Sequence, residues 1–306
     1  MKTAFLFSGQ GAQYPGMGKE LMKYEEAAQV FEAADKALGR SVSGLCFEGT
    51  AEELLLTHNT QPTVLAVDLA AGAALAQAGV LPDAVAGFSL GEYAALTFAG
   101  VMSREDAFSL IQLRADAMQK AVPVGKGAMA AMVGVPLEKV EDICRRVTAG
   151  YVIPANYNSP QQTVLSGSAE GIREALQLAE AEGLRCMKLA VSVPFHCAWM
   201  EPAARELGNA MEGIPFNNPS VPVYMNVDGK PLRSCETMKE MLVRQAMSPV
   251  QWVRTLEEMA KDGIDTFIEC GPGKTLSGLV KKTLKDVRIF RVEDEATLRK
   301  TLEGLS

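Results

Sequence analysis

The chain has 306 residues, 48% of them apolar or aromatic and 22% charged, a composition typical of a globular protein that buries a large core. Its 37 acidic residues outnumber 30 Lys and Arg residues, and the net charge of −7 argues against general binding to nucleic acid. The six cysteines form no C-x-x-C pair and only two histidines accompany them, so we expect reduced thiols, a cytoplasmic protein and no metal site.

Strand and helix patterns alternate along the first part of the chain, which predicts an α/β fold. The expected elements are a strand over 3–7 followed by a glycine-rich loop, helices over 20–38 and 60–79, a strand over 83–88, and helices over 90–100 and 103–122. Ser103 is placed to cap the last of these helices. The weakly polar run over 63–82 contains Asp68 and Gln77, and therefore suits a buried helix better than a membrane span.

The middle of the chain has a different order of elements. We expect a strand over 127–135, a helix over 136–150, hairpin strands over 151–159 and 163–167, a helix over 168–183 and a strand over 184–192. The order β-α-β-β-α-β is that of a ferredoxin-like unit. We therefore predict a small domain at 125–192, inserted into a larger α/β domain made of 1–124 and 193–306. Strands over 221–229 and 265–271, with one helix between them, would belong to the larger sheet.

The segment GFSLG, residues 87–91, places one serine between two glycines at the junction of a predicted strand and helix. In a nucleophile elbow, the residues two before and two after the serine approach neighbouring backbone, so both must be small. The turn exposes the Ser89 hydroxyl at a helix N-terminus, where the unpaired main-chain N–H of Leu90 can stabilise an oxyanion. The pattern predicts a nucleophilic serine; a glycine-rich strand end with a serine N-cap is the alternative.

A nucleophilic serine needs a base, and the two histidines are the candidates. His58 lies in LLLTHNTQPTV, ahead of a helix, where an exposed histidine is the ordinary expectation. His196 lies just past a strand, in a segment that re-enters the larger domain, and loops at strand ends often present catalytic side chains. We favour His196; the alternative for it is a core histidine bonded to backbone.

Two glycine-rich segments suggest a nucleotide site, but each lacks a required glycine. The first loop has Tyr14 where G-x-G-x-x-G needs its third glycine, and GPGKT has Ile268 where a P-loop needs its first. We therefore reject nucleotide binding by either motif. The glycines on both sides of Gln10 instead let the backbone approach a ligand, which makes the Gln10 N–H the candidate for a second oxyanion donor.

Arg114 lies in LRADAM, on the helix that follows the elbow helix. A guanidinium facing the pocket would bind a carboxylate through two parallel hydrogen bonds, and an esterase for neutral substrates needs no such cation. The alternative is a solvated arginine on an amphipathic helix, which is at least as consistent with the periodicity.

Eight spaced segments occur together in this chain: FSGQGAQYPGMG, GFSLGEYAAL, LRADAM, GAMAAMVG, YNSPQQTVLSG, VSVPFH, SPVQW and IECGPGKTLSGL. In this order they resemble the acyl-CoA:acyl-carrier-protein transacylases, most closely those that transfer malonyl groups in dissociated (type II) fatty acid synthesis. The resemblance covers essentially the whole chain. It implies an α/β-hydrolase-like core with a ferredoxin-like insert, a monomer, and no cofactor apart from malonyl-CoA as substrate and the phosphopantetheine carried by acyl carrier protein.

The resemblance also implies a reaction and roles for individual residues. Malonyl would pass from malonyl-CoA to Ser89 as an ester, and then to the phosphopantetheine thiol of acyl carrier protein. The matched positions are His196 as the base, the main-chain N–H groups of Gln10 and Leu90 as oxyanion donors, Arg114 as the carboxylate-binding residue, and Gln251 as the residue whose main-chain carbonyl orients His196. In this family that carbonyl stands in place of a triad aspartate.

Two further positions bear on the substrate. The family usually has histidine directly before the nucleophile, where this chain has Phe88, which cannot hydrogen-bond to an acyl group. Phe195 directly precedes the base. In related domains an aromatic residue at that position accompanies malonyl, and a smaller one accompanies branched extenders. We expect both rings to line the substrate pocket, and Phe195 to favour malonyl over methylmalonyl.

Other functions fit parts of this pattern. A serine thioesterase or esterase would share the elbow, the base and the oxyanion donors, but would pass the acyl group to water. A free-standing acyltransferase of a polyketide synthase would use identical catalytic steps. A non-enzymatic carrier-binding subunit with a decayed site is a further alternative. The basic segment GLVKKTLKDVR, with Lys281 and Lys282, is the hypothetical docking surface for an acidic carrier protein, although a solvated helix face has the same pattern.

Overall fold

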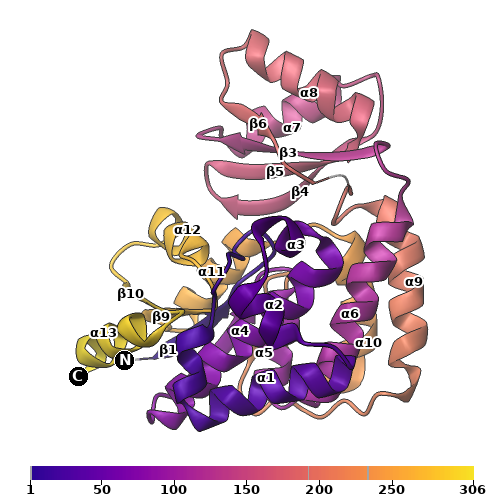
Figure 1. Cartoon of the computed structure of the whole chain (residues 1–306). Helices are drawn as coiled ribbons and strands as arrows, with labels where there is room; N and C mark the ends of the chain where they lie inside the picture. The colour runs from indigo at the N-terminus through magenta and orange to yellow at the C-terminus, as the bar shows by residue number, and fades with distance from the viewer. Residues whose placement is uncertain (1, 192, 233) are drawn as a thin grey trace.

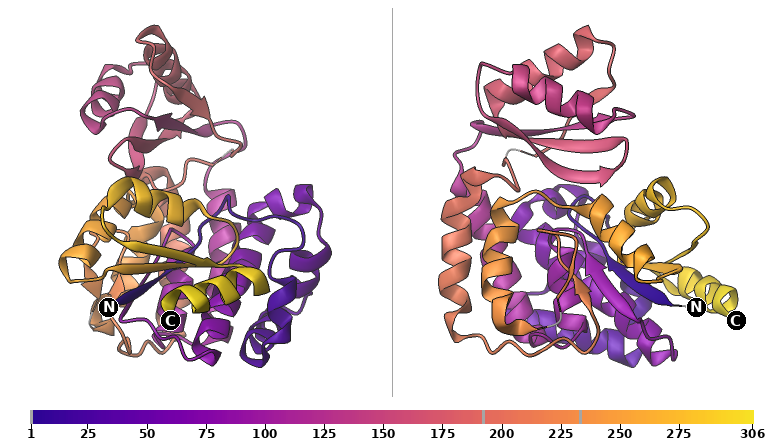
Figure 2. Two further views of the ribbon diagram at one scale, coloured as in Figure 1. Left: turned by 90° about the vertical axis from the view of Figure 1, so that its left-hand side faces the viewer. Right: turned by 180° about the vertical axis from the view of Figure 1, so that it is seen from behind.

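The computed structural model describes residues 2–191, 193–232 and 234–306, and it shows a mixed α/β protein with two separate sheets (Figure 1). The larger sheet lies in the main body, with the two termini on the same side of the molecule, and the smaller sheet lies above it (Figures 1 and 2). The α/β class predicted from the sequence is confirmed. Residue 192, the last of the predicted insert, lies outside the described residues.

Among the described residues, six strands form the larger sheet, in the order β10-β9-β1-β2-β7-β8. They are β1 (Thr3–Phe7), β2 (Ala84–Gly87), β7 (Val223–Tyr224), β8 (Pro231–Leu232), β9 (Thr266–Cys270) and β10 (Arg288–Val292). Neighbouring strands are parallel except for β7 and β8. Along the inner strand β1, Phe5 and Phe7 join one apolar cluster while Ala4 and Leu6 join another. Both faces of the sheet are therefore buried, as expected for parallel strands.

Helices surround this sheet. They are α1 (Glu25–Leu38), α2 (Val42–Glu48), α3 (Ala51–Leu55), α4 (Thr57–Gln77), α5 (Gly91–Phe98), α6 (Arg104–Ala121), α9 (Glu201–Ala210), α10 (Met238–Met247), α11 (Trp252–Lys261), α12 (Thr275–Thr283) and α13 (Glu295–Leu305). Short 3₁₀ helices occupy Lys19–Lys23, Ala198–Met200, Met211–Gly213 and Cys235–Thr237. Helix α4 packs against α1, α5 and α6 and is buried along most of its length, as the run over 63–82 predicts. Within the described ranges, no helix has both the length and the apolar character of a membrane span.

The smaller sheet has the antiparallel order β4-β5-β3-β6. Its segment contains, in chain order, β3 (Gly127–Val133), α7 (Leu137–Arg146), β4 (Val152–Ser159), β5 (Gln162–Ser168), α8 (Ala169–Ala181) and β6 (Cys186–Lys188). Ala130 of the sheet shares an apolar cluster with Val140 of α7 and Ile172 of α8. The alternate side chains Met129 and Ala131 belong instead to the core of the main body and line a cavity. One face of this sheet is therefore covered by its own helices, and the other faces the main body.

Main-chain hydrogen bonds join the two parts of the molecule. The Tyr157 N–H of β4 donates to the Val250 carbonyl at 2.9 Å, and the Val250 N–H donates to the Ala155 carbonyl, also at 2.9 Å. These bonds place β4 directly beside the segment that connects α10 to α11. Asn156 and Asn158 of β4 line the same cavity as Met129 and Ala131.

Several elements differ from the sequence-based expectations. The helix predicted from residue 20 begins at Glu25, because Tyr24 has an extended backbone that separates it from the preceding 3₁₀ turn. The single helix expected between 221–229 and 265–271 is two helices, α10 and α11, since Pro249 has no N–H to continue the first. Within 184–191, the described part of the strand expected over 184–192, only the three residues of β6 are a strand. The sequence analysis missed β8 and β10.

Candidate active site

Ser89 lies in a sharp turn between β2 and α5, and its backbone has a left-handed φ of 54°. A Cβ atom on Gly87 would lie 1.8 Å from the Gly91 carbonyl oxygen, and one on Gly91 would lie 2.3 Å from the Phe7 carbonyl oxygen. Both distances are far inside van der Waals contact, so only glycine fits at either position. The turn therefore has the crowding that the elbow pattern predicts.

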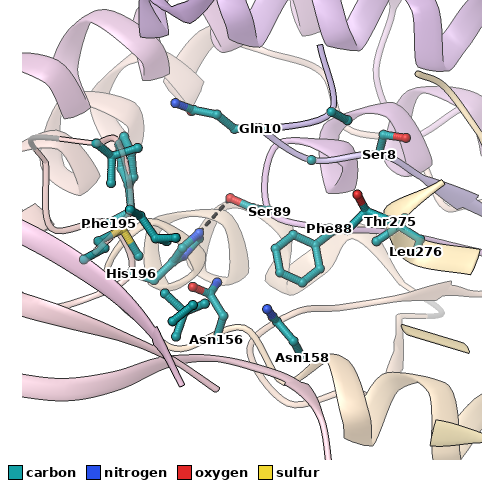
Figure 3. A pocket seen from close by; sticks show the side chains of 18 of the residues that line it. Ser8, Gln10, Phe88, Ser89, Asn156, Asn158, Phe195, His196, Thr275 and Leu276 are labelled. Carbon is teal, nitrogen blue, oxygen red and sulfur yellow. Dashed lines mark hydrogen bonds between the residues drawn. The ribbon is translucent and has the colours of Figure 1, made fainter. Parts of the chain in front are cut away.

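His196 is the histidine that meets this serine. Its Nε2 lies 2.7 Å from the Ser89 Oγ (Figure 3), and its side chain is buried. Its Nδ1 lies 3.1 Å from the main-chain carbonyl oxygen of Gln245. Because a carbonyl only accepts, Nδ1 carries the proton and Nε2 is left to accept from the serine hydroxyl. The pair therefore has the geometry of a nucleophile and its general base.

Gln251 does not orient His196, contrary to the role that the resemblance implies. The Gln251 carbonyl accepts from the N–H and the hydroxyl of Thr255, at 2.9 Å and 3.0 Å, in the first turn of α11. Gln245 supplies the carbonyl instead. It lies in the last turn of α10, where main-chain carbonyls have no partner within the helix. The break at Pro249 was the sequence signal for those free carbonyls.

Arg114 is buried beside the nucleophile, with 1% of its surface exposed, so it is not a solvated surface residue. Its Nη1 donates to Gln61 Oε1 at 2.8 Å. Its Nη2 donates to Ser89 Oγ at 3.1 Å and to Gln245 Oε1 at 3.2 Å. The guanidinium also lies over the Tyr93 ring, with Cζ 5.5 Å from the ring centroid. A fixed positive charge is therefore present within hydrogen-bonding distance of the reacting oxygen.

Burial and the neighbouring Arg114 charge lower the pKa of His196 to about 3, and hydrogen bonds to the Gln245 and Ser248 carbonyls only partly oppose this shift. The imidazole is consequently neutral near pH 7. It can accept the serine proton without first losing one of its own.

Asn226 holds the elbow in place and was missed by the sequence analysis. Its Oδ1 accepts from the Ser89 N–H at 2.7 Å, and its Nδ2 donates to the Gly87 carbonyl at 2.7 Å. Its own N–H donates to Glu92 Oε2 at 2.5 Å. Burial raises the pKa of Glu92 to about 8. The sequence signal for Asn226 was its place just after β7, the strand next to β2. The carboxyl ends of neighbouring parallel strands commonly form binding sites.

A cavity of about 460 Å³ opens over Ser89 between the main body and the smaller sheet. Five of the predicted site residues line it besides Ser89, namely Gln10, Phe88, Arg114, Phe195 and His196. Phe88 points toward the cavity and packs edge-on against Trp252, with ring centroids 5.3 Å apart (Figure 3). Asn156 and Asn158 of β4 also line the cavity, and the sequence analysis did not single them out.

Neither Leu90 nor the rejected base candidate His58 lines this cavity. Leu90 is the N-cap residue of α5, where main-chain N–H groups have no partner within the helix. His58 is exposed in the first turn of α4 and lines a second cavity with Asp116 and Lys120, so it does not serve Ser89. Among the residues that the structure describes, no group of three or more His, Cys, Asp and Glu side chains could hold a metal ion.

The chain belongs to the acyl transferase domain family, whose model matches residues 4–301. It is 42% identical over 308 residues to the malonyl CoA-acyl carrier protein transacylase of Bacillus subtilis, covering 99% of this chain and 97% of that protein. It is 40% identical to the protein of the same name from Escherichia coli K12, covering 98% of each chain.

Solved structures of such proteins have the same fold. The malonyl CoA-acyl carrier protein transacylase of Clostridium perfringens superposes with a TM-score of 0.96 and 41% identity, covering 100% of this chain and 97% of that one. A malonyl-transacylase solved in complex with a type II polyketide acyl carrier protein gives a TM-score of 0.95 and 40% identity, covering 99% and 100%.

Proposed function

We propose that this protein transfers the malonyl group from malonyl-CoA to the phosphopantetheine thiol of an acyl carrier protein, through an ester on Ser89. The observation that carries the proposal is the contact of the buried Arg114 guanidinium with the Ser89 hydroxyl at 3.1 Å. A cation at that position suits an acyl group that ends in a carboxylate. The names of the relatives support the same substrate pair.

The first half-reaction loads the serine. His196 Nε2 takes the hydroxyl proton as Ser89 Oγ attacks the thioester carbon of malonyl-CoA. The N–H groups of Gln10 and Leu90 would stabilise the oxyanion that forms. When the intermediate collapses, the C–S bond breaks and the CoA thiolate takes the proton from the imidazolium. The products are malonyl-Ser89 and CoA.

The second half-reaction reverses these steps with a different thiol. His196 takes the proton of the phosphopantetheine thiol, whose sulfur attacks the ester carbon. The Ser89 oxygen leaves and recovers its proton from the imidazolium. Arg114 would hold the malonyl carboxylate in both halves, and Phe88 and Phe195 would line the acyl site. The reaction needs only groups of this chain and its two substrates, and we propose that it takes place in the cytoplasm without a further cofactor.

The fold supports a matching division into domains. We assign 1–124 and 193–306 to an α/β-hydrolase-like catalytic domain and 125–192 to a ferredoxin-like insert. The order β4-β5-β3-β6, with both helices on one face, is the arrangement expected for the insert. The elbow between β2 and α5 is the expected place of a nucleophile in the larger domain.

The test is intact-protein mass spectrometry after brief exposure to malonyl-CoA, methylmalonyl-CoA or acetyl-CoA, for wild type and Ser89→Ala. We expect a malonyl adduct on wild type alone, which moves to acyl carrier protein when that protein is added. An adduct lost to water equally fast without carrier protein would instead identify a thioesterase. Comparing carrier proteins from fatty acid and polyketide synthesis would separate those two pathways.

A further inference from the structure

Resting on this proposed function, we infer that the side-chain carboxamide of Gln245 is a positioning group that ties Arg114 to the elbow and so sets the preference for acyl groups bearing a carboxylate. This role is separate from that of the Gln245 main-chain carbonyl, which holds His196.

Three polar atoms of Gln245 contact the three functional residues. Its main-chain oxygen accepts from His196 Nδ1 at 3.1 Å. Its side-chain Oε1 accepts from Arg114 Nη2 at 3.2 Å, and its Nε2 donates to the Ser89 carbonyl at 2.7 Å. Gln245 is 1% exposed, so water does not compete with these bonds. A carboxamide is planar, and fixing its nitrogen on Ser89 therefore also fixes the oxygen that receives Arg114.

Gln61 and Gln245 hold opposite ends of the guanidinium. Gln61 accepts a hydrogen bond from Nη1, whereas Gln245 accepts one from Nη2, the nitrogen that also donates to Ser89 Oγ. When malonyl is bound to Ser89 as an ester, its free carboxylate would approach the guanidinium at Nη2, the nitrogen nearest to Ser89 Oγ. The position of Nη2 relative to the ester oxygen is then set by Gln245, through the bond that Gln245 makes to the backbone of the serine itself.

The two roles of Gln245 can be separated by mutation. Gln245→Met keeps the main-chain carbonyl and an unbranched side chain suited to a helix, but removes both side-chain hydrogen bonds. Gln245→Glu is nearly isosteric, keeps an acceptor for Arg114, loses the donor to Ser89 and adds a negative charge that competes with the malonyl carboxylate. Gln61→Met is the matched control, because it removes a different hydrogen bond of the same guanidinium and keeps the bonds of Gln245 to Ser89 and His196.

The measurement is the rate of serine acylation by malonyl-CoA and by acetyl-CoA across pH, by rapid-quench mass spectrometry. For Gln245→Met and Gln245→Glu we expect the malonyl-to-acetyl ratio of kcat/KM to fall about tenfold or more, mainly through KM for malonyl-CoA. The acid limb of the pH–rate profile for acetylation should lie at the same pH as in wild type, because both variants keep the main-chain carbonyl that accepts from His196. Gln61→Met should lower the ratio less.

In an Arg114→Ala background, Gln245→Met should no longer change the ratio, because the residue it positions is gone. An unchanged ratio in both Gln245 variants would overturn the inference, as would equal losses in Gln61→Met and Gln245→Met. After either of these outcomes, transfer of malonyl to carrier protein by the wild-type enzyme would still support the proposed function. Absence of malonyl loading in wild type would instead remove the proposed function itself.

Discussion

Ser89 and His196, whose side chains share a hydrogen bond of 2.7 Å, both have a left-handed backbone, with φ of 54° and 59°. In the part of the chain that the structure describes, Asp286 is the only other non-glycine residue with a positive φ. Such a conformation costs a residue with a Cβ roughly 1 kcal/mol or more, so the surrounding contacts must impose it. At Ser89 those contacts are the Asn226 and Gln245 hydrogen bonds to its main chain.

This strain predicts a difference between two inactive variants. Ser89→Gly and Ser89→Ala both lose the hydroxyl and its contacts with His196 and Arg114, but only glycine adopts a left-handed φ without strain. We expect Ser89→Gly to be more stable than Ser89→Ala by about 1 kcal/mol in urea unfolding. Equal unfolding free energies would show that the turn is not strained.

Arg114→Ala should change the choice of acyl group. Removing the guanidinium removes the partner for a carboxylate, so malonyl loading should fall by about a hundredfold or more. Acetyl loading should hold or rise, because a neutral acyl group no longer faces an unmatched buried charge. Competition between malonyl-CoA and acetyl-CoA, read by adduct mass, checks this. A proportional fall in both would assign Arg114 a structural role instead.

The depressed pKa of His196 predicts the pH dependence of acetyl loading. Burial first, and the Arg114 charge second, lower that pKa to about 3, so the acid limb should lie far below the ordinary histidine value of 6.5. In Arg114→Ala the second cause is removed, and the limb should move to higher pH. If the acid limb of Arg114→Ala lies at the same pH as that of wild type, the Arg114 charge does not lower the pKa of His196.

The same shift has a consequence for stability. The unfolded chain protonates this histidine near 6.5, and the folded chain does so only near 3. The unfolded state therefore binds more protons between these values, so the free energy of unfolding falls as pH falls through that window. His196→Gln should flatten this part of the profile in denaturant titrations.

Gly271 packs against Asp68 and against Ser8, which precedes the glycine-rich loop that carries Gln10. It has a φ of 124°, and a Cβ there would lie 1.8 Å from Asp68 Oδ1 and 2.8 Å from Ser8 Oγ. We expect Gly271→Ala to cost about 3 kcal/mol or more and to impair acyl loading, since Ser8 leads into the loop that carries Gln10. Gly278→Ala in α12 is the control, because its Cβ would meet nothing within 4 Å, and it should be neutral or stabilising.

Phe195 should restrict the acyl group. Its ring lines the cavity directly beside the base. Phe195→Ser should raise methylmalonyl loading relative to malonyl by about tenfold, since one methyl group in a close-fitting pocket has an effect of that size. An unchanged ratio would place the acyl group away from this ring.

Contacts that are local in sequence were predictable. The close approach of Gly87 to the Gly91 carbonyl and the Ser103 cap involve residues close together in the chain, so their sterics and hydrogen bonds follow from the local sequence. The weakly polar composition of α4 likewise predicted its burial. A single base candidate beside a strand end was also enough to choose His196 over His58. The local sequence was therefore sufficient to predict the elbow, its histidine and the alternation of strands and helices.

The groups that surround Ser89 and His196 depend on how distant segments of the chain pack together. Gln245 rather than Gln251 holds His196, because helix α10 ends ahead of Pro249 and the Gln245 carbonyl in its last turn accepts from the imidazole. The periodicity of α6 allowed Arg114 to be solvated, and its packing against Gln61 and Gln245 buried it. These partners lie 49 to 131 residues apart in the chain, and no local pattern specifies them. They meet only when sheet and helices pack, because burial then forces each polar group to find a hydrogen-bonding partner.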